Sequence, residues 1–357
     1  MSIIIYRKIA KLLKLIFIFF GLHPIPLDYE NKMTDKPFAE KLLKLWSIFL
    51  MITRVVVFLA VIYYQDLIFY DRDSVGKIND VLKFTMVYFA YVVIIVESII
   101  NKNRLKIIYC KFKSFRFECK VLNINYDQYM DEMLKDYIKK IIYLFVFFIF
   151  VEYNVTTHIG RQMWVNFYAV NIISTFCCRF RHMQHVYYID LIRSHILMLK
   201  NELQKIVDQS NAGYLSTNKE FYELSLEKLQ AIKRGYGQIW DITNNINDLL
   251  TWSQAANFTH NFVQMGKYKL LKLYLEKNFI HLFIACDMYW SYHILLNSSI
   301  EDSYATTILC SVSPIPILSF VLFSAERAKV EVNSLNYLAL TITKLSQLGS
   351  QYFKNPA

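Results

Sequence analysis

The stretch from Leu43 to Tyr64, LKLWSIFLMITRVVVFLAVIYY, decides the class of this protein. A helix needs roughly 20 mostly apolar residues to cross the hydrocarbon core of a membrane, which is about 30 Å thick. Val81 to Ile100 is a second such stretch, and Ile141 to Ile159, Met163 to Phe180 and Tyr304 to Phe323 are three more. The sequence therefore predicts an all-α polytopic membrane protein.

A sixth crossing is predicted between Ile246 and Leu296, where the apolar pattern is interrupted. The interruption contains Lys267, Lys269, Lys272 and Lys277. Each lysine would cost up to about 2.5 to 3.5 kcal/mol at the centre of a spanning helix. Without the segment 266–282 the flanking residues join into one apolar span, so we predict six transmembrane helices with an insert at 266–282. A translated intron and a lineage-specific loop both explain such an insert.

The overall composition agrees with a membrane protein. Hydrophobic residues make up 55% of the chain and charged residues only 19%, against about 25% charged residues in soluble domains. The formal charge of +11 falls in blocks between apolar runs, which favours charge sorting across a bilayer over a nucleic-acid partner. The six cysteines show no metal-type spacing, and we predict neither a metal nor a cofactor.

The distribution of lysine and arginine predicts the orientation. Basic residues crowd segment 1–42 and the connection 102–120, whereas the connection after the first span is acidic. Because basic loops stay on the cytoplasmic side, the N-terminus is expected in the cytoplasm. We expect no cleaved signal peptide. The sequons at Asn154 and Asn297 then fall outside, so both are predicted glycosylation sites.

These features divide the chain into five parts. They are a cytoplasmic N-terminal segment (1–42), transmembrane helices 1–4 (43–180), a cytoplasmic helical hairpin (181–245), transmembrane helices 5–6 (246–323) and a cytoplasmic tail (324–357). The hairpin begins as a long extension of the fourth helix with a heptad seam, formed by Ile189, Ile192, Ile196, Leu199, Leu203 and Ile206. Packing within one subunit and assembly between subunits explain this seam equally well.

Polar groups inside apolar spans are candidates for function, because they are costly to bury there. They are Arg54, Glu97, Glu152 and Asp287, of which Glu97 and Glu152 also fit the membrane interface. The candidate ligand-pocket residues are Tyr88, Trp164, Tyr168, Asn171, Asp287 and Trp290. Aromatic residues with a few hydrogen-bonding groups are typical of small-molecule sites. An aromatic belt or plain packing is the simpler explanation of the same residues.

Catalysis is not predicted. The sequence holds no His-Glu-x-x-His motif and no paired-carboxylate pattern. His182 and His185 have a helical spacing that would suit a shared metal ion, but Arg179 and Arg181 stand beside them. An interfacial anchor is therefore the preferred interpretation of this basic run.

The order of several short motifs resembles the insect gustatory receptor family. They are Phe180-Arg181-His182, Tyr187-Tyr188-Ile189-Asp190, Asn257-Phe258-Thr259-His260-Asn261-Phe262 and Asp287-Met288-Tyr289-Trp290. The resemblance runs from about Phe20 to about Lys329. It implies a seven-helix receptor related to insect odorant receptors, with a cytoplasmic N-terminus in the plasma membrane. It also implies a subunit of a homo- or hetero-tetrameric cation channel, gated by small tastants bound in the outer half of the bundle.

One departure from the family affects conduction. The family's last span lines the pore and ends in Thr-Tyr, five mostly apolar residues and Gln-Phe, and no such span follows Phe323 here. As written, the chain is expected to be a truncated, non-conducting form, and no pore residue is carried over. The alternatives are a solute transporter, which would show an internal repeat, and a G-protein-coupled-type receptor, which the predicted orientation of the N-terminus disfavours.

Overall fold

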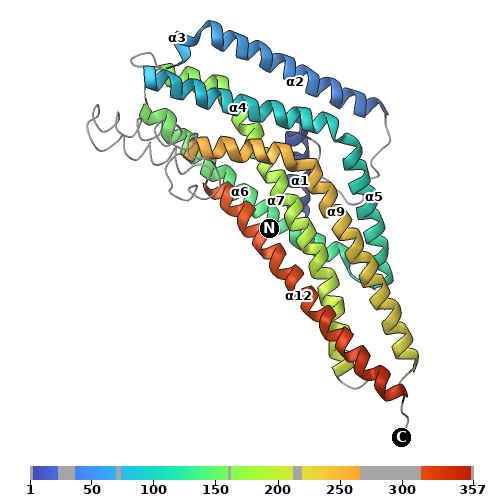
Figure 1. Ribbon diagram of the computed structural model, residues 1–357. Coiled ribbons are helices and arrows are strands. Elements are labelled where there is room, and N and C mark those ends of the chain that lie inside the picture. The colour runs from blue at the N-terminus through green and yellow to red at the C-terminus, as the bar shows by residue number, and fades with distance from the viewer. Residues whose placement is uncertain are drawn as a thin grey trace.

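The fold is described from a computed structural model. The structure describes residues 3–22, 37–69, 74–159, 162–211, 219–265 and 315–354. Every element in these ranges is an α-helix (Figure 1). The helices are α1 (Ile3–Phe19), α2 (Pro37–Tyr63), α3 (Gln65–Ile68), α4 (Ser74–Ile100), α5 (Lys102–Val121), α6 (Tyr126–Ile159), α7 (Gln162–Asn211), α9 (Lys219–Met265) and α12 (Ile315–Lys354). The predicted all-α class is confirmed.

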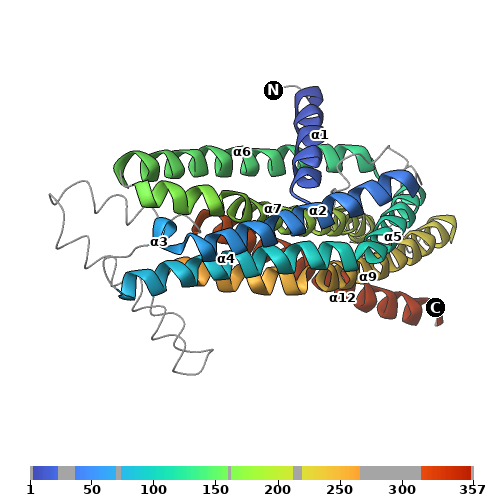
Figure 2. The ribbon, with the colours of Figure 1, turned by 90° about the horizontal axis from the view of Figure 1, so that it is seen from above.

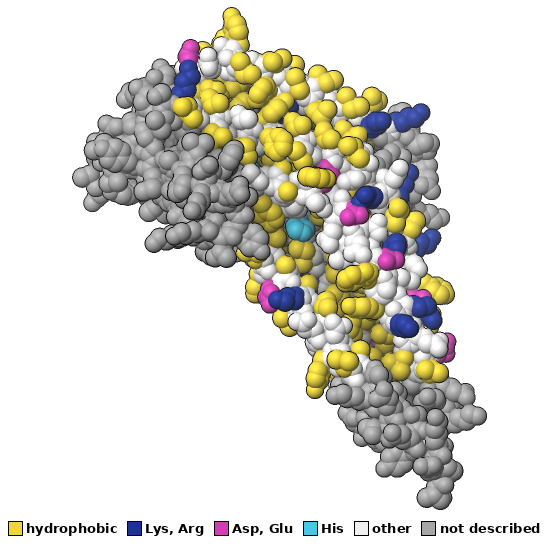
Figure 3. Space-filling model, in the orientation of Figure 1, with side chains coloured by type: hydrophobic (Ala, Val, Ile, Leu, Met, Phe, Trp, Pro, Cys, Tyr) yellow, Lys and Arg dark blue, Asp and Glu magenta, His cyan; other side chains and the backbone are white. Residues whose placement is uncertain are grey.

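Two helices in the described part are long and apolar enough to cross a membrane. The stretches are Lys41–Tyr63 in α2 and Asp80–Ile100 in α4, which match the first two predicted spans. Only 11% of the first stretch is buried inside the protein, against 44% of the second. Figure 3 shows hydrophobic side chains over this upper part of the molecule and charged side chains towards the lower right. The outer face of α2 therefore suits contact with lipid.

The long extension of the fourth helix is confirmed, and its cytoplasmic location stays a prediction. Helix α7 has 50 residues, which corresponds to a length of about 75 Å at 1.5 Å per residue. This is more than twice the thickness of the hydrocarbon core. In Figure 1, α5, α7, α9 and α12 converge towards the lower right, where the C-terminus lies. A helical bundle thus continues beyond the apolar part of the molecule.

Several parts of this bundle are absent from the sequence-based interpretation. The basic connection 102–120 is helix α5, which packs along α9. Helix α9 runs without interruption from the second arm of the hairpin into the fifth predicted span. Helix α6 begins at Tyr126, well before the predicted start of the third span at Ile141. Their mixed charged and apolar sequences give no spanning signal, so hydropathy alone did not reveal them.

The heptad seam of α7 is buried inside the chain. Ile196, Leu199, Leu203 and Ile206 are all at most 4% exposed and belong to the main core. The same core includes Phe115 of α5 and Ile239 of α9. Packing within one subunit is therefore sufficient to account for this seam. The predicted insert at 266–282 lies outside the described residues and stays a prediction.

Candidate ligand site

An aromatic cluster joins α2, α3, α4 and α7 in the apolar half of the bundle. Phe58 of α2 stacks on Tyr88 of α4, with 4.5 Å between ring centroids, and its centroid lies 5.7 Å from that of Phe84. Phe69 contacts both Phe84 and Phe167 of α7, at 5.8 and 6.4 Å between centroids. The rings come from the faces on which these apolar helices meet, so they form a continuous aromatic wall.

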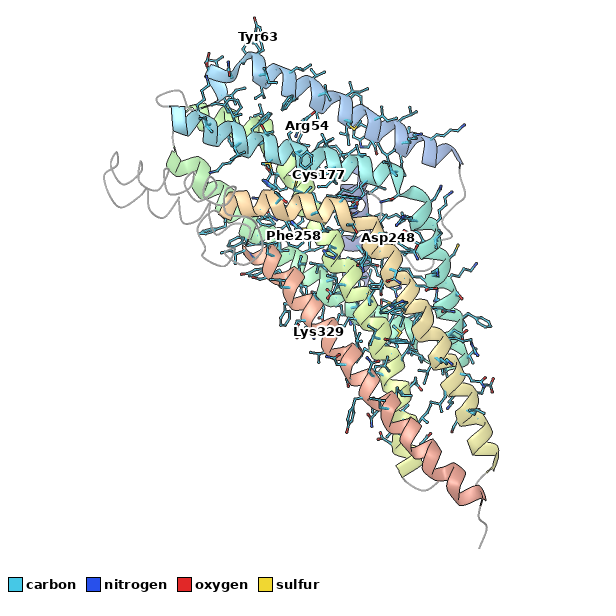
Figure 4. The ribbon with its side chains drawn as sticks, in the orientation of Figure 1. Arg54, Tyr63, Cys177, Asp248, Phe258 and Lys329 are labelled. Atoms are coloured by element: carbon cyan, nitrogen blue, oxygen red, sulfur yellow. The ribbon has the colours of Figure 1, made fainter. Side chains whose placement is uncertain are left out.

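A buried arginine lies beside this wall. Arg54 is only 5% exposed, and its guanidinium donates a hydrogen bond from Nη1 to the carbonyl oxygen of Val170, at 3.0 Å. The guanidinium carbon also lies 5.6 Å from the ring centroid of Tyr91, a distance suited to a cation–π contact. Figure 4 shows Arg54 on α2, next to α4, with Cys177 of α7 farther into the bundle. Arg54 thus connects the three helices.

Three polar atoms at this site lack a hydrogen-bond partner among the described residues. They are Nη2 of Arg54, the hydroxyl oxygen of Tyr91 and Oδ1 of Asn171, all buried. Asn171 is 6% exposed, and its Nδ2 group donates a hydrogen bond to the carbonyl oxygen of Phe167, at 3.0 Å. The cluster therefore holds a cationic donor, a hydroxyl group and an amide oxygen without partners beside aromatic rings.

The structure describes two of the predicted pocket residues. Tyr88 belongs to the aromatic wall, and Asn171 directly follows Val170, whose carbonyl oxygen accepts from Arg54. The side chains of Trp164 and Tyr168 on α7 are not among those described, and Asp287 and Trp290 lie outside the described residues. Phe58, Phe84 and Phe167 were missed, because aromatic residues are common in apolar spans and carry no distinguishing sequence signal.

The structure does not test the two predicted glycosylation sites. The backbone of Asn154 lies within the last turns of α6, and its side chain is not described. Asn297 lies outside the described residues. Both glycosylation sites remain predictions.

A buried ion pair forms a second polar centre, deeper in the bundle. Glu97 of α4 and Arg181 of α7 are 5% and 1% exposed, and Nη2 of Arg181 lies 2.7 Å from Oε2 of Glu97. Arg181 also donates to Oγ of Ser253, at 2.8 Å, and to Oε1 of Gln184, at 3.0 Å. Arg181 is therefore no interfacial anchor, and Glu97 is a buried partner of a cation, not a group exposed at the membrane surface.

This ion pair lies against a bend in α9. Glu97 accepts backbone N–H groups from Trp252, at 3.0 Å, and from Ser253, at 3.2 Å. Arg181 donates to the carbonyl oxygen of Leu249, and Asn101 donates to that of Asp248. In an undistorted helix these four backbone groups would pair with one another. Side chains supply their partners here, close to where α9 changes direction near Asp248 (Figure 4).

Polar side chains continue along the contact between α7 and α9. Nδ2 of Asn257 donates to the carbonyl oxygen of Cys178, at 3.0 Å, and Asn261 lies 2.6 Å from Nε2 of His182. His182 is therefore buried against an amide and a ring of α9, not anchored at a membrane surface. Within the part of the chain that the structure describes, no three metal-type side chains gather to hold an ion.

The comparison with known protein families agrees with this architecture. Residues 10–265 match the family model described as 7tm Chemosensory receptor. This range covers most of the chain and includes both polar centres. It also agrees with the resemblance to insect gustatory receptors, and the family is not one of enzymes. No match was found among curated proteins. The chain is a membrane protein that belongs to the 7tm chemosensory receptor family.

Proposed function

We propose that the chain is a gustatory receptor subunit that binds a small tastant at the cluster of Arg54, Tyr88 and Asn171. The observation that carries this proposal is the set of buried polar atoms, Nη2 of Arg54, the hydroxyl oxygen of Tyr91 and Oδ1 of Asn171, that lack a hydrogen-bond partner among the described residues. A buried polar group without a partner costs about 1 to 3 kcal/mol. A ligand that supplies one acceptor and one donor would recover much of that cost.

The chemistry of the cluster defines the ligand class. Phe58, Phe84 and Tyr88 stack on one another into an aromatic wall that suits a compact apolar or ring-shaped body. The guanidinium of Arg54 favours a carbonyl, hydroxyl or ether oxygen, and Asn171 favours a hydroxyl or N–H donor. Sugars and bitter heterocycles both combine these features, so the proposed ligand is a neutral small molecule of one of these two kinds.

The proposed setting is the plasma membrane, with six crossings, a cytoplasmic N-terminus and assembly with itself or other gustatory receptors into a tetrameric cation channel. Its support is the asymmetry of basic residues along the sequence and the family match. Epitope tags on the N-terminus and on the predicted outer connection after the first span test the orientation. Staining of the N-terminal tag on intact cells would reverse it.

Ligand binding is tested with the full chain purified in detergent. Thermal unfolding is recorded with sugars such as sucrose and fructose and with a neutral bitter compound such as caffeine, and at least one compound should raise the midpoint. Asn171→Leu should lower the affinity for that compound by about tenfold, which corresponds to one lost hydrogen bond in a desolvated site. The matched control is Asn244→Leu, because Asn244 is exposed on α9. Equal affinity for both variants would reject the site.

A further inference from the structure

Helix α1 has one face committed to the protein. Tyr6, Ala10, Leu13 and Phe17 are between 0 and 8% exposed and belong to the main core. They recur at spacings of four, three and four residues, which places them on one side of the helix. This face holds α1 against α6 and its neighbours.

A second apolar face of α1 is uncovered. Ile5, Leu12, Leu15 and Phe19 are 44%, 57%, 62% and 59% exposed. At 100° per residue they lie roughly opposite the buried face. A helix that needed only to pack on a protein and face water would carry polar residues there. The exposed apolar residues therefore require another apolar environment.

Basic side chains lie on and beside this second face, because at 100° per residue Lys8 falls within it and Lys11 at its edge. The helix holds Arg7, Lys8, Lys11 and Lys14 and no aspartate or glutamate. Arg7 is paired with Asp131 of α6, at 3.1 Å, which leaves Lys8, Lys11 and Lys14 as the cationic groups available along the helix. Lys8 and Lys11 are exposed. Lysines beside an apolar stripe match a surface of anionic headgroups over acyl chains.

The position of α1 agrees with such a surface. Figure 2 shows α1 standing roughly at right angles to α2, α4 and α6 and projecting from the side of the bundle. Its C-terminal end is fixed to α2, because Nε1 of Trp46 donates to the carbonyl oxygen of Phe19, at 3.0 Å. Trp46 lies in the first turns of the spanning stretch Lys41–Tyr63, and tryptophan favours the membrane–water interface. Helix α1 therefore meets the first turns of this spanning stretch at a large angle to it.

We propose that α1 is an interfacial helix that inserts Ile5, Leu12, Leu15 and Phe19 among acyl chains and binds anionic lipid headgroups through Lys8, Lys11 and Lys14. The assignment to the cytoplasmic leaflet rests on the proposed orientation of the N-terminus, whereas the contact with anionic lipid does not. The rival occupant of this face is an apolar helix of another protein, and the experiments separate the two.

The first experiment identifies what touches the exposed face. A photoreactive benzoylphenylalanine replaces Leu12 in the full chain, in nanodiscs of phosphatidylcholine with about 30% phosphatidylserine, a fraction chosen to give an anionic surface. Mass spectrometry after illumination should show lipid adducts at position 12. The same replacement at Leu226, exposed on the distal part of α9, should give none. A polypeptide adduct at position 12, or equal lipid labelling at both positions, would overturn the proposal.

The second experiment tests the headgroup. The full chain is extracted from these nanodiscs, and the phosphatidylserine retained per chain is measured. Lys8→Gln with Lys11→Gln should lower retention by up to about thirtyfold, as expected for two lost contacts of roughly fivefold each to an anionic surface. Lys228→Gln with Lys233→Gln on α9 is the control with an equal change in charge. Unchanged retention in the α1 variant, or an equal loss in the control, would contradict the headgroup contact.

A third variant separates charge from folding. Lys8→Arg with Lys11→Arg keeps both positive charges and should restore retention to that of the parent chain, and failure to do so would count against an electrostatic contact. Both leaflets of the nanodisc have the same composition, so these results do not depend on the orientation of the chain. Failure of the tag experiment would therefore move α1 to the other leaflet without affecting the lipid contact itself.

Discussion

Glu97→Gln should destabilise the chain more than any single change at a surface ion pair. The substitution keeps the shape of the side chain but removes its negative charge. Arg181, 1% exposed, would then lose its carboxylate partner while remaining in the same buried position. An uncompensated charge in the interior is far more costly than one in water.

The magnitude follows from the contacts at Glu97. Removal of one partner of a buried ion pair costs about 3 to 5 kcal/mol. Glutamine also offers only one acceptor oxygen, so one of the two backbone N–H groups, from Trp252 or Ser253, loses its acceptor. We therefore expect a loss of about 4 kcal/mol in the free energy of unfolding. The double variant with Arg181→Gln should lose less than the sum of the two single changes, by at least about 1 kcal/mol.

The assay is unfolding of the full chain by sodium dodecyl sulfate in mixed micelles, followed by tryptophan fluorescence. Asp241→Asn is the matched control, because Asp241 pairs with Lys111 at an exposed position and such pairs contribute about 0 to 1 kcal/mol. If Glu97→Gln lies within about 1 kcal/mol of this control, or if the double variant is additive, the pair does not hold the helices as described.

Three further predictions concern other parts of the chain. Burial lowers the pKa of His195 to about 4. Its contribution to the free energy of unfolding is therefore complete above pH 6.5 and is lost as the pH falls towards 4. His195→Asn should reduce the change in the free energy of unfolding between these two pH values by up to about 3 kcal/mol. Burial raises the pKa of the Cys119 thiol to about 12, so a maleimide at pH 7.5 should label the exposed Cys110 and spare Cys119 in the folded chain, and equal labelling would contradict that core. Gly21→Ala should destabilise the chain by about 1 to 3 kcal/mol, because φ is +72° and a Cβ would lie 2.9 Å from Ile95. Gly237→Ala has open space around it and should stabilise the chain by about 0.5 to 1 kcal/mol. Both are measured by thermal unfolding, and equal effects would refute the local geometry.

The candidate site was foreseeable in part. Arg54 stood out because a polar group is costly in an apolar span, and this cost can be judged from one residue and its neighbours. Tyr88 and Asn171 were among the predicted pocket residues, whereas Phe58, Phe84 and Phe167 were not. Their role depends on which rings meet across helices. In an apolar span every face carries such residues, so periodicity gives no sign of which face turns inward.

The sequence by itself determined the membrane class, the first two spans and the long fourth helix. Those features follow from hydropathy summed over neighbouring residues, which is a local property. The tertiary structure alone decided that Glu97 meets Arg181 and that Arg54 reaches Val170, pairs separated by 84 and 116 positions. It also decided the bend of α9 and the docking of α5. These depend on how each helix is rotated about its axis and which neighbour it packs against, and the packing of many side chains at once sets that rotation.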